Sequence, residues 1–194
     1  MESLKELLWK VRACRTCVPH LPYGPRPVLR LRETSRLLII GQAPGTKVHD
    51  SGIPWDDASG DRLRSWLDID HDAFYDERRV AIIPMGLCYP GRHGNGGDLP
   101  PRRECAPLWH TRLLSHLPAV SLTLLVGSFA QRYYLGQSCG KSVTETVCNW
   151  QQYMPTFFPL PHPSWRTRGW VTKNEWYETD LLPELRRRII DLLS

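Results

Sequence analysis

The sequence has none of the features that mark membrane or secreted proteins. No apolar run approaches the roughly 20 residues that a membrane-spanning helix needs. The first six residues include two acids and no long apolar core, so they do not resemble a secretory signal. Internal repeats and low-complexity segments are also absent. We therefore expect an intracellular, cytoplasmic protein without a membrane segment.

The chain is not acidic either, because basic residues are in excess. Its 194 residues carry a formal net charge of +5, which favours a polyanionic partner. Hydrophobic residues make up 41% and charged residues 23%, as in globular proteins. The length favours one α/β domain over residues 1–194. Arginines that suit phosphate binding, or simply a solvated surface, are Arg26, Arg30, Arg32, Arg36, Arg102, Arg103, Arg166 and Arg168.

Cysteine is scarce, and four of the six cysteines form two pairs. Cys14 and Cys17 make a Cys-x-x-Cys motif, and Cys88 and Cys105 are separated by 16 residues. Disulfides are rare inside cells, so this motif is more typical of metal binding or redox chemistry. It ends an expected helix instead of opening one, which argues against a thioredoxin-like site. Four thiolates could hold zinc or an iron–sulfur cluster, and buried reduced cysteines without metal are the alternative.

An apolar run that ends abruptly in glycine and proline organises the chain. Residues 37–40 are Leu-Leu-Ile-Ile, as in a strand buried on both faces of a parallel sheet. The Gly-Gln-Ala-Pro-Gly that follows at residues 41–45 cannot continue the strand. Open α/β proteins bind ligands at the carboxyl edge of such a sheet. A strand that simply ends in a Gly/Pro loop, without a binding site, would give the same pattern.

Strand and helix patterns alternate along the chain, which predicts an α/β fold with a mostly parallel sheet and helices on both faces. We expect strands over residues 37–40, 80–84, 121–127 and 157–160. We expect helices over residues 3–11, 102–117, 128–135, 142–153 and 174–193, and one more from Ser59 or Asp61 to residue 67. A long irregular loop over residues 86–101 is of the kind that is functional or disordered.

Four motifs occur in an order that resembles a known family. They are the Cys-x-x-Cys motif, Gly-Gln-Ala-Pro-Gly at residues 41–45, Gly-Ile-Pro-Trp at residues 52–55 and His-Pro-Ser at residues 162–164. Together they resemble the uracil-DNA glycosylase superfamily, and they are most similar to its iron–sulfur (family 4-like) branch. The resemblance implies a three-layer α/β/α sandwich around a four-stranded parallel sheet. It also implies that Cys14, Cys17, Cys88 and Cys105 ligate a [4Fe-4S] cluster of structural role, with zinc as the alternative metal.

The resemblance assigns the base-binding residues as well. Trp55 takes the place of a phenylalanine that stacks on the flipped base. Gly41, Gln42 and Ala43 belong to the motif whose backbone donors meet the base carbonyl. His162 would lie beside O2 of a uracil; taken alone, it could equally be an ordinary histidine in a Pro-rich turn.

The sequence departs from its relatives at the expected carboxylate. The glutamate of the iron–sulfur branch is replaced by Gln42, and the aspartate that other branches place next is Ala43. Another branch (family 5) has an aspartate just before Ser-Gly-Asp, and residues 57–61 resemble that arrangement. We therefore expect Asp57 to orient the water and stabilise the sugar cation, with Asp56 as the second candidate. A helix cap or turn is the structural alternative for both.

A second departure concerns base selection. The asparagine with which the iron–sulfur branch reads uracil is replaced by Pro84. Gln42 or Asn95 could substitute for it, and the substrates could then include a wider range of deaminated or oxidised bases.

The resemblance further implies that the loop after the histidine enters the minor groove. Ser164 would bind a phosphate and Trp165 or Arg166 would fill the gap left by the base; a hydrophobic corner is the alternative.

These features favour a monomeric DNA-repair glycosylase that hydrolyses the N-glycosidic bond of uracil or a related damaged base in DNA. We expect it to be monofunctional, because the only lysine near the first motif is Lys47 and none is placed to form a Schiff base. A non-catalytic protein that binds damaged or abasic DNA is one alternative. A zinc-stabilised enzyme acting on nucleotides is another, but the glycine-rich loop lacks the Gly-Lys-Ser/Thr of a P-loop.

Overall fold

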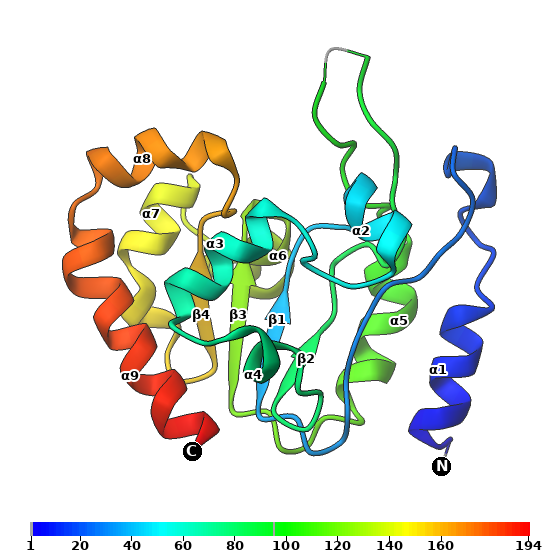
Figure 1. Ribbon diagram of the computed structural model, residues 1–194, viewed down its shortest axis with the longest axis horizontal. Helices are drawn as coiled ribbons and strands as arrows, with labels where there is room; N and C mark the ends of the chain where they lie inside the picture. Colours follow the sequence, from blue (N-terminus) through cyan, green and yellow to red (C-terminus); the bar gives the residue numbers. More distant parts are fainter. Residues whose placement is uncertain (1, 95) are drawn as a thin grey trace.

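A four-stranded parallel sheet lies at the centre of the computed structural model, which describes residues 2–94 and 96–194 (Figure 1). Its strands are β1 (Leu37–Ile40), β2 (Val80–Ile82), β3 (Leu122–Val126) and β4 (Phe157–Leu160). They lie in the order β2-β1-β3-β4, and every neighbouring pair is parallel. All four residues of β1 are buried, as the apolar run predicts for a strand covered on both faces.

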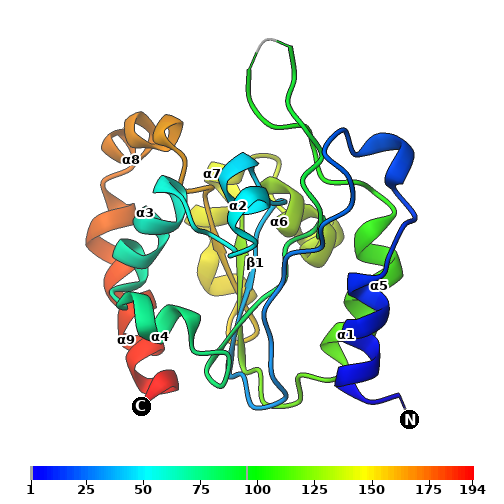
Figure 2. The ribbon, with the colours of Figure 1, turned by 45° about the vertical axis from the view of Figure 1, so that its right-hand side comes forward.

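Helices cover both faces of the sheet and complete three layers (Figures 1 and 2). One face packs against α1 (Leu4–Arg12), α5 (Cys105–Leu114) and α6 (Ser128–Leu135). The other packs against α3 (Ala58–Leu67), α4 (His71–Tyr75), α7 (Val143–Cys148) and α9 (Leu182–Leu193). Side chains of β1 alternate between the two hydrophobic clusters, as the two-residue period of a strand requires. The predicted α/β/α sandwich is confirmed. Within the described residues, no helix is long and apolar enough to cross a membrane.

The carboxyl ends of the strands meet at one edge of the sheet, and the connections there carry the conspicuous sequence motifs (Figures 1 and 2). β1 leads into residues 41–45 and the short helix α2 (Thr46–Ser51), and β2 leads into the loop of residues 86–101. β4 leads into His162. Parallel pairing therefore gathers segments that are more than 100 residues apart in the sequence.

Several expected helices have other boundaries in the structure. The expected helix over residues 102–117 is shorter, since α5 spans Cys105–Leu114. The expected helix over residues 142–153 is interrupted after α7, and a 3₁₀ turn (Trp150–Tyr153) follows. The Asn149 side chain donates to the Glu145 carbonyl at 3.0 Å, and such side-chain bonds compete with a helix. Before α9, residues Tyr177–Leu181 form a π-helical turn instead of regular α-helix.

The segment after His162 is helical, so the expectation of a loop there was wrong. It forms a 3₁₀ turn (Trp165–Thr167) followed by α8 (Arg168–Lys173). The His162 carbonyl accepts hydrogen bonds from the Ser164 N–H at 2.8 Å and the Thr167 hydroxyl at 2.5 Å, which start the turn. Helices of about six residues are too short to show a hydrophobic period. The sequence pattern did not predict α2 for the same reason.

A buried histidine connects α5 to the end of β2. His110 is almost fully buried; its Nε2 lies 3.1 Å from the Pro84 carbonyl and its Nδ1 lies 2.5 Å from the Tyr134 hydroxyl. Because a carbonyl only accepts, Nε2 carries the proton and Nδ1 accepts from the tyrosine. Burial lowers the pKa of His110 to about 4. The imidazole is therefore neutral in the folded protein at neutral pH.

This histidine predicts a stability that depends on pH. An unfolded histidine titrates near pH 6.5, so the unfolded chain binds the extra proton first as pH falls from about 6.5 to about 4. The free energy of unfolding should fall over that window by up to about 3 kcal/mol from His110 alone. Denaturant unfolding of wild type and His110→Gln as a function of pH measures this. The variant should be less stable at neutral pH but lose less on acidification; equal slopes would contradict the assignment.

Candidate active site

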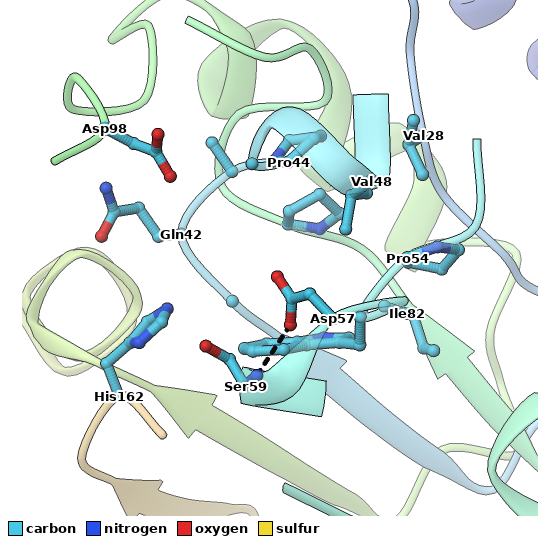
Figure 3. Close-up of a pocket in the computed structure, with 15 residues that line it drawn as sticks. Val28, Gln42, Pro44, Val48, Pro54, Asp57, Ser59, Ile82, Asp98 and His162 are labelled. Atoms are coloured by element: carbon cyan, nitrogen blue, oxygen red, sulfur yellow. Dashed lines mark hydrogen bonds between the residues drawn. The ribbon is translucent and has the colours of Figure 1, made fainter. Parts of the chain in front are cut away.

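A cavity of about 100 Å³ lies where the connections after three of the strands meet the start of α3 (Figure 3). Its wall combines residues 41–45 after β1, Trp55, Asp57 and Ser59 around the start of α3, Pro84 after β2 and His162 after β4. Ligand pockets for drug-sized molecules run to about 300–1,000 Å³, so this cavity suits one flat ring. The structure thus brings together six of the residues that the sequence predicts for base binding and catalysis: Gly41, Gln42, Ala43, Trp55, Asp57 and His162.

Trp55 is held in place by two close approaches to glycines. A Cβ atom at Gly41 would lie 2.7 Å from the Trp55 ring, and one at Gly60 would lie 1.7 Å from the Trp55 carbonyl oxygen. Both glycines are therefore needed for the indole to lie where it does. The backbone of Trp55 has a φ of 60°, a left-handed conformation that is costly for a bulky residue. Its ring centroid lies 5.8 Å from that of His162.

Asp57 caps α3 and also faces the cavity. Its Oδ1 accepts a hydrogen bond from the Ser59 N–H at 2.9 Å (Figure 3) and another from the Gly60 N–H, also at 2.9 Å. The structural alternative raised by the sequence, a helix cap, is therefore correct, but the two roles are compatible. Oδ2 has no hydrogen-bond partner among the described residues. One carboxylate oxygen of the cap therefore remains available to a ligand.

His162 projects into the cavity from a rigid support. It lies between two buried prolines, and Arg62 on α3 donates to the Ser164 carbonyl at 2.6 Å. Gln131 on α6 donates to the carbonyls of Leu125 and Leu160, which joins the ends of β3 and β4 below the histidine. Burial lowers the pKa of His162, and the nearby Asp57 carboxylate acts in the opposite direction. A neutral imidazole that donates one hydrogen bond follows from this environment.

One carboxylate of the cavity was missed from the sequence. Asp98 lies on the wall beside Gln42 and comes from the loop of residues 86–101 (Figure 3). Burial raises the pKa of its carboxyl. This loop is rich in Gly and Pro and has no regular hydrophobic pattern, so its unusual length is the one feature of the sequence that indicates a site. Pro84 also lines the cavity, whereas Asn95 lies outside the described residues.

Four predicted residues lie outside the cavity wall. Asp56 is exposed and does not line the cavity, so the geometry favours Asp57 over it. Ser164, Trp165 and Arg166 follow His162 on the outer surface, and 72% of the Trp165 surface is exposed. A Cβ atom at Gly97 would lie 3.9 Å from the Arg166 guanidinium, so this turn lies beside the loop that carries Asp98.

The cysteines of the two pairs line a second, separate cavity. Cys14 and Cys17 follow α1, Cys88 lies in the loop after β2 and Cys105 begins α5. Burial raises the pKa of Cys88 to about 11 and that of Cys105 to about 12, so as free thiols both stay protonated. Cys105 Sγ accepts a hydrogen bond from the Leu87 N–H at 3.3 Å. Among the described residues, no group of three or more His, Cys, Asp or Glu side chains is close enough to hold a single metal ion.

Comparison with models of protein families shows to which family the chain belongs. The family model described as the Uracil DNA glycosylase superfamily matches residues 30–186. The chain belongs to the uracil DNA glycosylase superfamily. The match covers every cavity residue from Gly41 to His162, together with Cys88 and Cys105, but it begins after Cys14 and Cys17.

Three of the arginines singled out in the sequence stabilise the glycosylase fold. Arg26 donates to the carbonyls of His49 and Asp50 at the end of α2, and the second of these bonds measures 2.8 Å. Arg30 donates to the Tyr75 carbonyl at 3.4 Å, and Arg36 donates to the Ser194 carbonyl at 3.1 Å. These contacts explain their position before β1 without a phosphate.

The packing of Trp55 gives a testable prediction. Gly60→Ala places a methyl group against the Trp55 carbonyl, so the turn must shift, and overpacking of this kind costs about 1–3 kcal/mol. Chemical denaturation monitored by circular dichroism measures the loss. Gly169→Ala is the matched control, because nothing lies within 4 Å of its added Cβ in α8. It should be neutral or slightly stabilising; an equal loss in both variants would refute the close approach.

Proposed function

We propose that the protein is a DNA glycosylase that removes a flipped uracil, and related deaminated bases, by hydrolysis of the N-glycosidic bond. The observation that carries the proposal is the convergence of Trp55, Asp57 and His162 on one cavity of the size of a base. Superfamily membership supports the reaction class. The three side chains supply the three functions that the reaction needs: a surface for the base, a charge for the sugar and a donor for the leaving group.

Trp55 provides the surface that receives the base. Unstacking a base from DNA costs a few kcal/mol. Stacking on an aromatic side chain returns about 1–3 kcal/mol per base in proteins that bind single strands. Because Gly41 and Gly60 fix the indole before DNA binds, little ordering of this side chain is left to the binding step. Residues 41–43 form the adjoining wall, where backbone N–H groups of Gln42 and Ala43 are available to a base carbonyl.

His162 and Asp57 act on opposite charges of the transition state. As the bond from C1′ to the base breaks, its electron pair leaves with the base and the sugar becomes cationic. A neutral His162 donates a hydrogen bond to O2 of the departing base; one such donor contributes about 3 kcal/mol in other enzymes. Asp57 Oδ2 orients a water that attacks C1′, and its negative charge stabilises the sugar. The proton that the water loses passes to solvent, and the released base anion takes one from solvent. The two N–H bonds to Oδ1 hold the carboxylate in place and leave Oδ2 for the water.

Contact with the DNA backbone falls to the helical turn after His162. Ser164, Trp165 and Arg166 lie on the surface next to the cavity residues, and Trp165 is largely exposed. An exposed aromatic side chain beside an arginine suits insertion into a groove, where it replaces the extruded base.

Among the described residues, no lysine lines the cavity, and this supports a monofunctional hydrolase.

We further propose that Cys14, Cys17, Cys88 and Cys105 bind a [4Fe-4S] cluster, as in the iron–sulfur branch of the superfamily. The cavity residues fit an anionic group: Arg102 lines the same cavity, and its buried Nε has no partner among the described atoms. A single ion needs thiolates about 2.3 Å from it, a tighter arrangement than the described cysteines offer. The Leu87 N–H is a donor to a thiolate at Cys105. When bound, the cluster would hold α1 and the loop of residues 86–101 together.

The glycosylase proposal is tested with oligonucleotides that contain one uracil, cleaved at abasic sites by hot alkali. His162→Ala should lower the single-turnover rate about 100- to 1,000-fold, because one hydrogen bond to the leaving base is lost. Asp57→Asn should lower it strongly as well, while the helix cap is kept, since Asn is as good an N-cap as Asp. Equal thermal stability of Asp57→Asn and wild type would show that charge, and not folding, is responsible.

Asp56→Asn is the matched control for this assay. Asp56 is the exposed neighbour of Asp57 and does not line the cavity, so its rate should stay within about threefold of wild type. Cleavage by wild type that survives in His162→Ala would contradict the assigned roles. Retained binding of damaged DNA without any strand break would favour the non-catalytic alternative.

The cluster proposal is tested by metal and sulfide analysis of anaerobically purified protein. Iron and acid-labile sulfide should be present, and Cys88→Ser and Cys105→Ser should each lose most of both. Cys148→Ser is the control, because Cys148 is exposed and outside the cavity. Zinc instead of iron, or equal iron loss in the control, would contradict the proposal.

A further inference from the structure

A second, larger groove lies at the end of the molecule opposite the candidate active site. It has a volume of about 970 Å³ and lies between α1 and the segments that lead into β1 and β2. Arg36 directly precedes β1 and Arg79 directly precedes β2, so the groove is at the amino edge of the sheet. The cavity with His162 is at the carboxyl edge (Figure 1). The groove is therefore separate from the surface that we assign to DNA.

The floor of the groove is aliphatic. Leu4 and Leu8 on α1 line it together with Leu31, and both helix residues are only partly buried. They differ by four positions, so they lie one above the other on the same face of the helix. The core face of α1 is a different one, on which Leu7 and Val11 are fully buried. The helix thus has a second apolar stripe, which faces the groove.

Cationic side chains surround this floor, and three of them have no acidic partner. The groove is lined by six cations and three acids: Lys5, Arg12, Arg32, Arg36, Arg78 and Arg79, with Glu33, Asp76 and Glu77. Asp76 pairs with the two arginines that precede β2, at nitrogen–oxygen distances of 2.8 and 3.7 Å. Among the described residues, Lys5, Arg12 and Arg32 form no ion pair. The groove therefore has an excess of positive charge that the chain itself does not neutralise.

An exposed tryptophan borders these cations on α1. Trp9 is four residues after Lys5 and three before Arg12, so the three side chains are neighbours on the helix surface. Of the Trp9 surface, 70% is exposed. Tryptophan and arginine are enriched among the residues that dominate the binding energy of protein interfaces. Neither the hydrophobic core nor the candidate active site uses this indole.

We propose that the groove binds an acidic segment of another protein, an amphipathic helix that lies along α1. Its apolar side chains pack on Leu4 and Leu8, and its carboxylates face Lys5 and Arg32. Recognition of a helix in a groove uses apolar anchors three or four residues apart, which is the spacing of the two leucines. Charge complementarity brings such a partner to the groove and fixes its register. The proposal is independent of the glycosylase reaction, because it uses the opposite edge of the sheet.

Two other occupants fit the groove less well. A nucleic acid would find cations for its phosphates, but the floor offers leucines instead of an aromatic ring on which a base stacks. A second copy of the chain, related by a twofold axis, would bring the same cations face to face, and like charges repel. An acidic segment with apolar side chains is complementary to both the floor and the charged walls.

Selection of a random-peptide phage library on the purified protein tests the proposal. The selected peptides should be acidic and should carry large apolar residues three or four positions apart. Fluorescence anisotropy of one labelled peptide then measures its Kd. The double variant Lys5→Glu/Arg32→Glu should raise Kd at least about tenfold and reduce its dependence on salt. Trp9→Ser should raise Kd about tenfold as well.

The matched controls change exposed residues elsewhere on the surface. Lys141→Glu reverses a charge just before α7, and Ile190→Ser removes an apolar side chain on α9, where the residue is 58% exposed. Both should bind the peptide as wild type does. All four variants should cleave uracil at the wild-type rate, because the groove is remote from the cavity. Failure of the glycosylase proposal would leave the peptide result unaffected.

Several results would overturn the proposal. One is a selection that yields no acidic peptides, and another is a peptide that the groove variants and the controls bind equally well. A uracil-free oligonucleotide whose Kd rises in Lys5→Glu/Arg32→Glu as much as that of the peptide would identify a nucleic-acid site instead. A dimer in analytical ultracentrifugation that Trp9→Ser dissociates would identify self-association.

Discussion

The parallel pairing of the four strands is the constraint on which the site depends. All four strands run in the same direction, so the connections after β1, β2 and β4 leave the sheet at one edge. Three sequence motifs that are far apart in the chain meet there. The buried core on both faces of β1 fixes that edge relative to α3, whose N-terminus supplies Asp57. A rigid cavity follows from this architecture.

Within the cavity, backbone geometry and charge are closely connected. Gly60 lacks a Cβ so that Trp55 can turn back over the start of α3, and the same Gly60 donates its N–H to Asp57. One glycine thus positions both the surface for the base and the carboxylate for the sugar. The two acids differ in environment: Asp57 accepts N–H bonds at a helix terminus, whereas Asp98 is desolvated on a hairpin.

The sequence predicted the parts of the fold that depend on strong local signals. The strand β1 and the helices α1 and α6 all appear where the pattern placed them. The short helices α2 and α8 were not predicted, because helices of six residues have too few apolar positions to show a period. Asp98 could not be found in this way either: its burial comes from a hairpin bridge and from Tyr89, which no local pattern encodes.

In the proposed reaction the cavity takes a base out of DNA, and water completes the cleavage at the sugar. Mass spectrometry of a single turnover in ¹⁸O-labelled water, with an oligonucleotide that carries one uracil, tests this most directly. We expect free, unlabelled uracil and an abasic site that carries the label at C1′. Label in the released base, a broken strand without a free base, or unchanged DNA with functional, DNA-bound protein would contradict it.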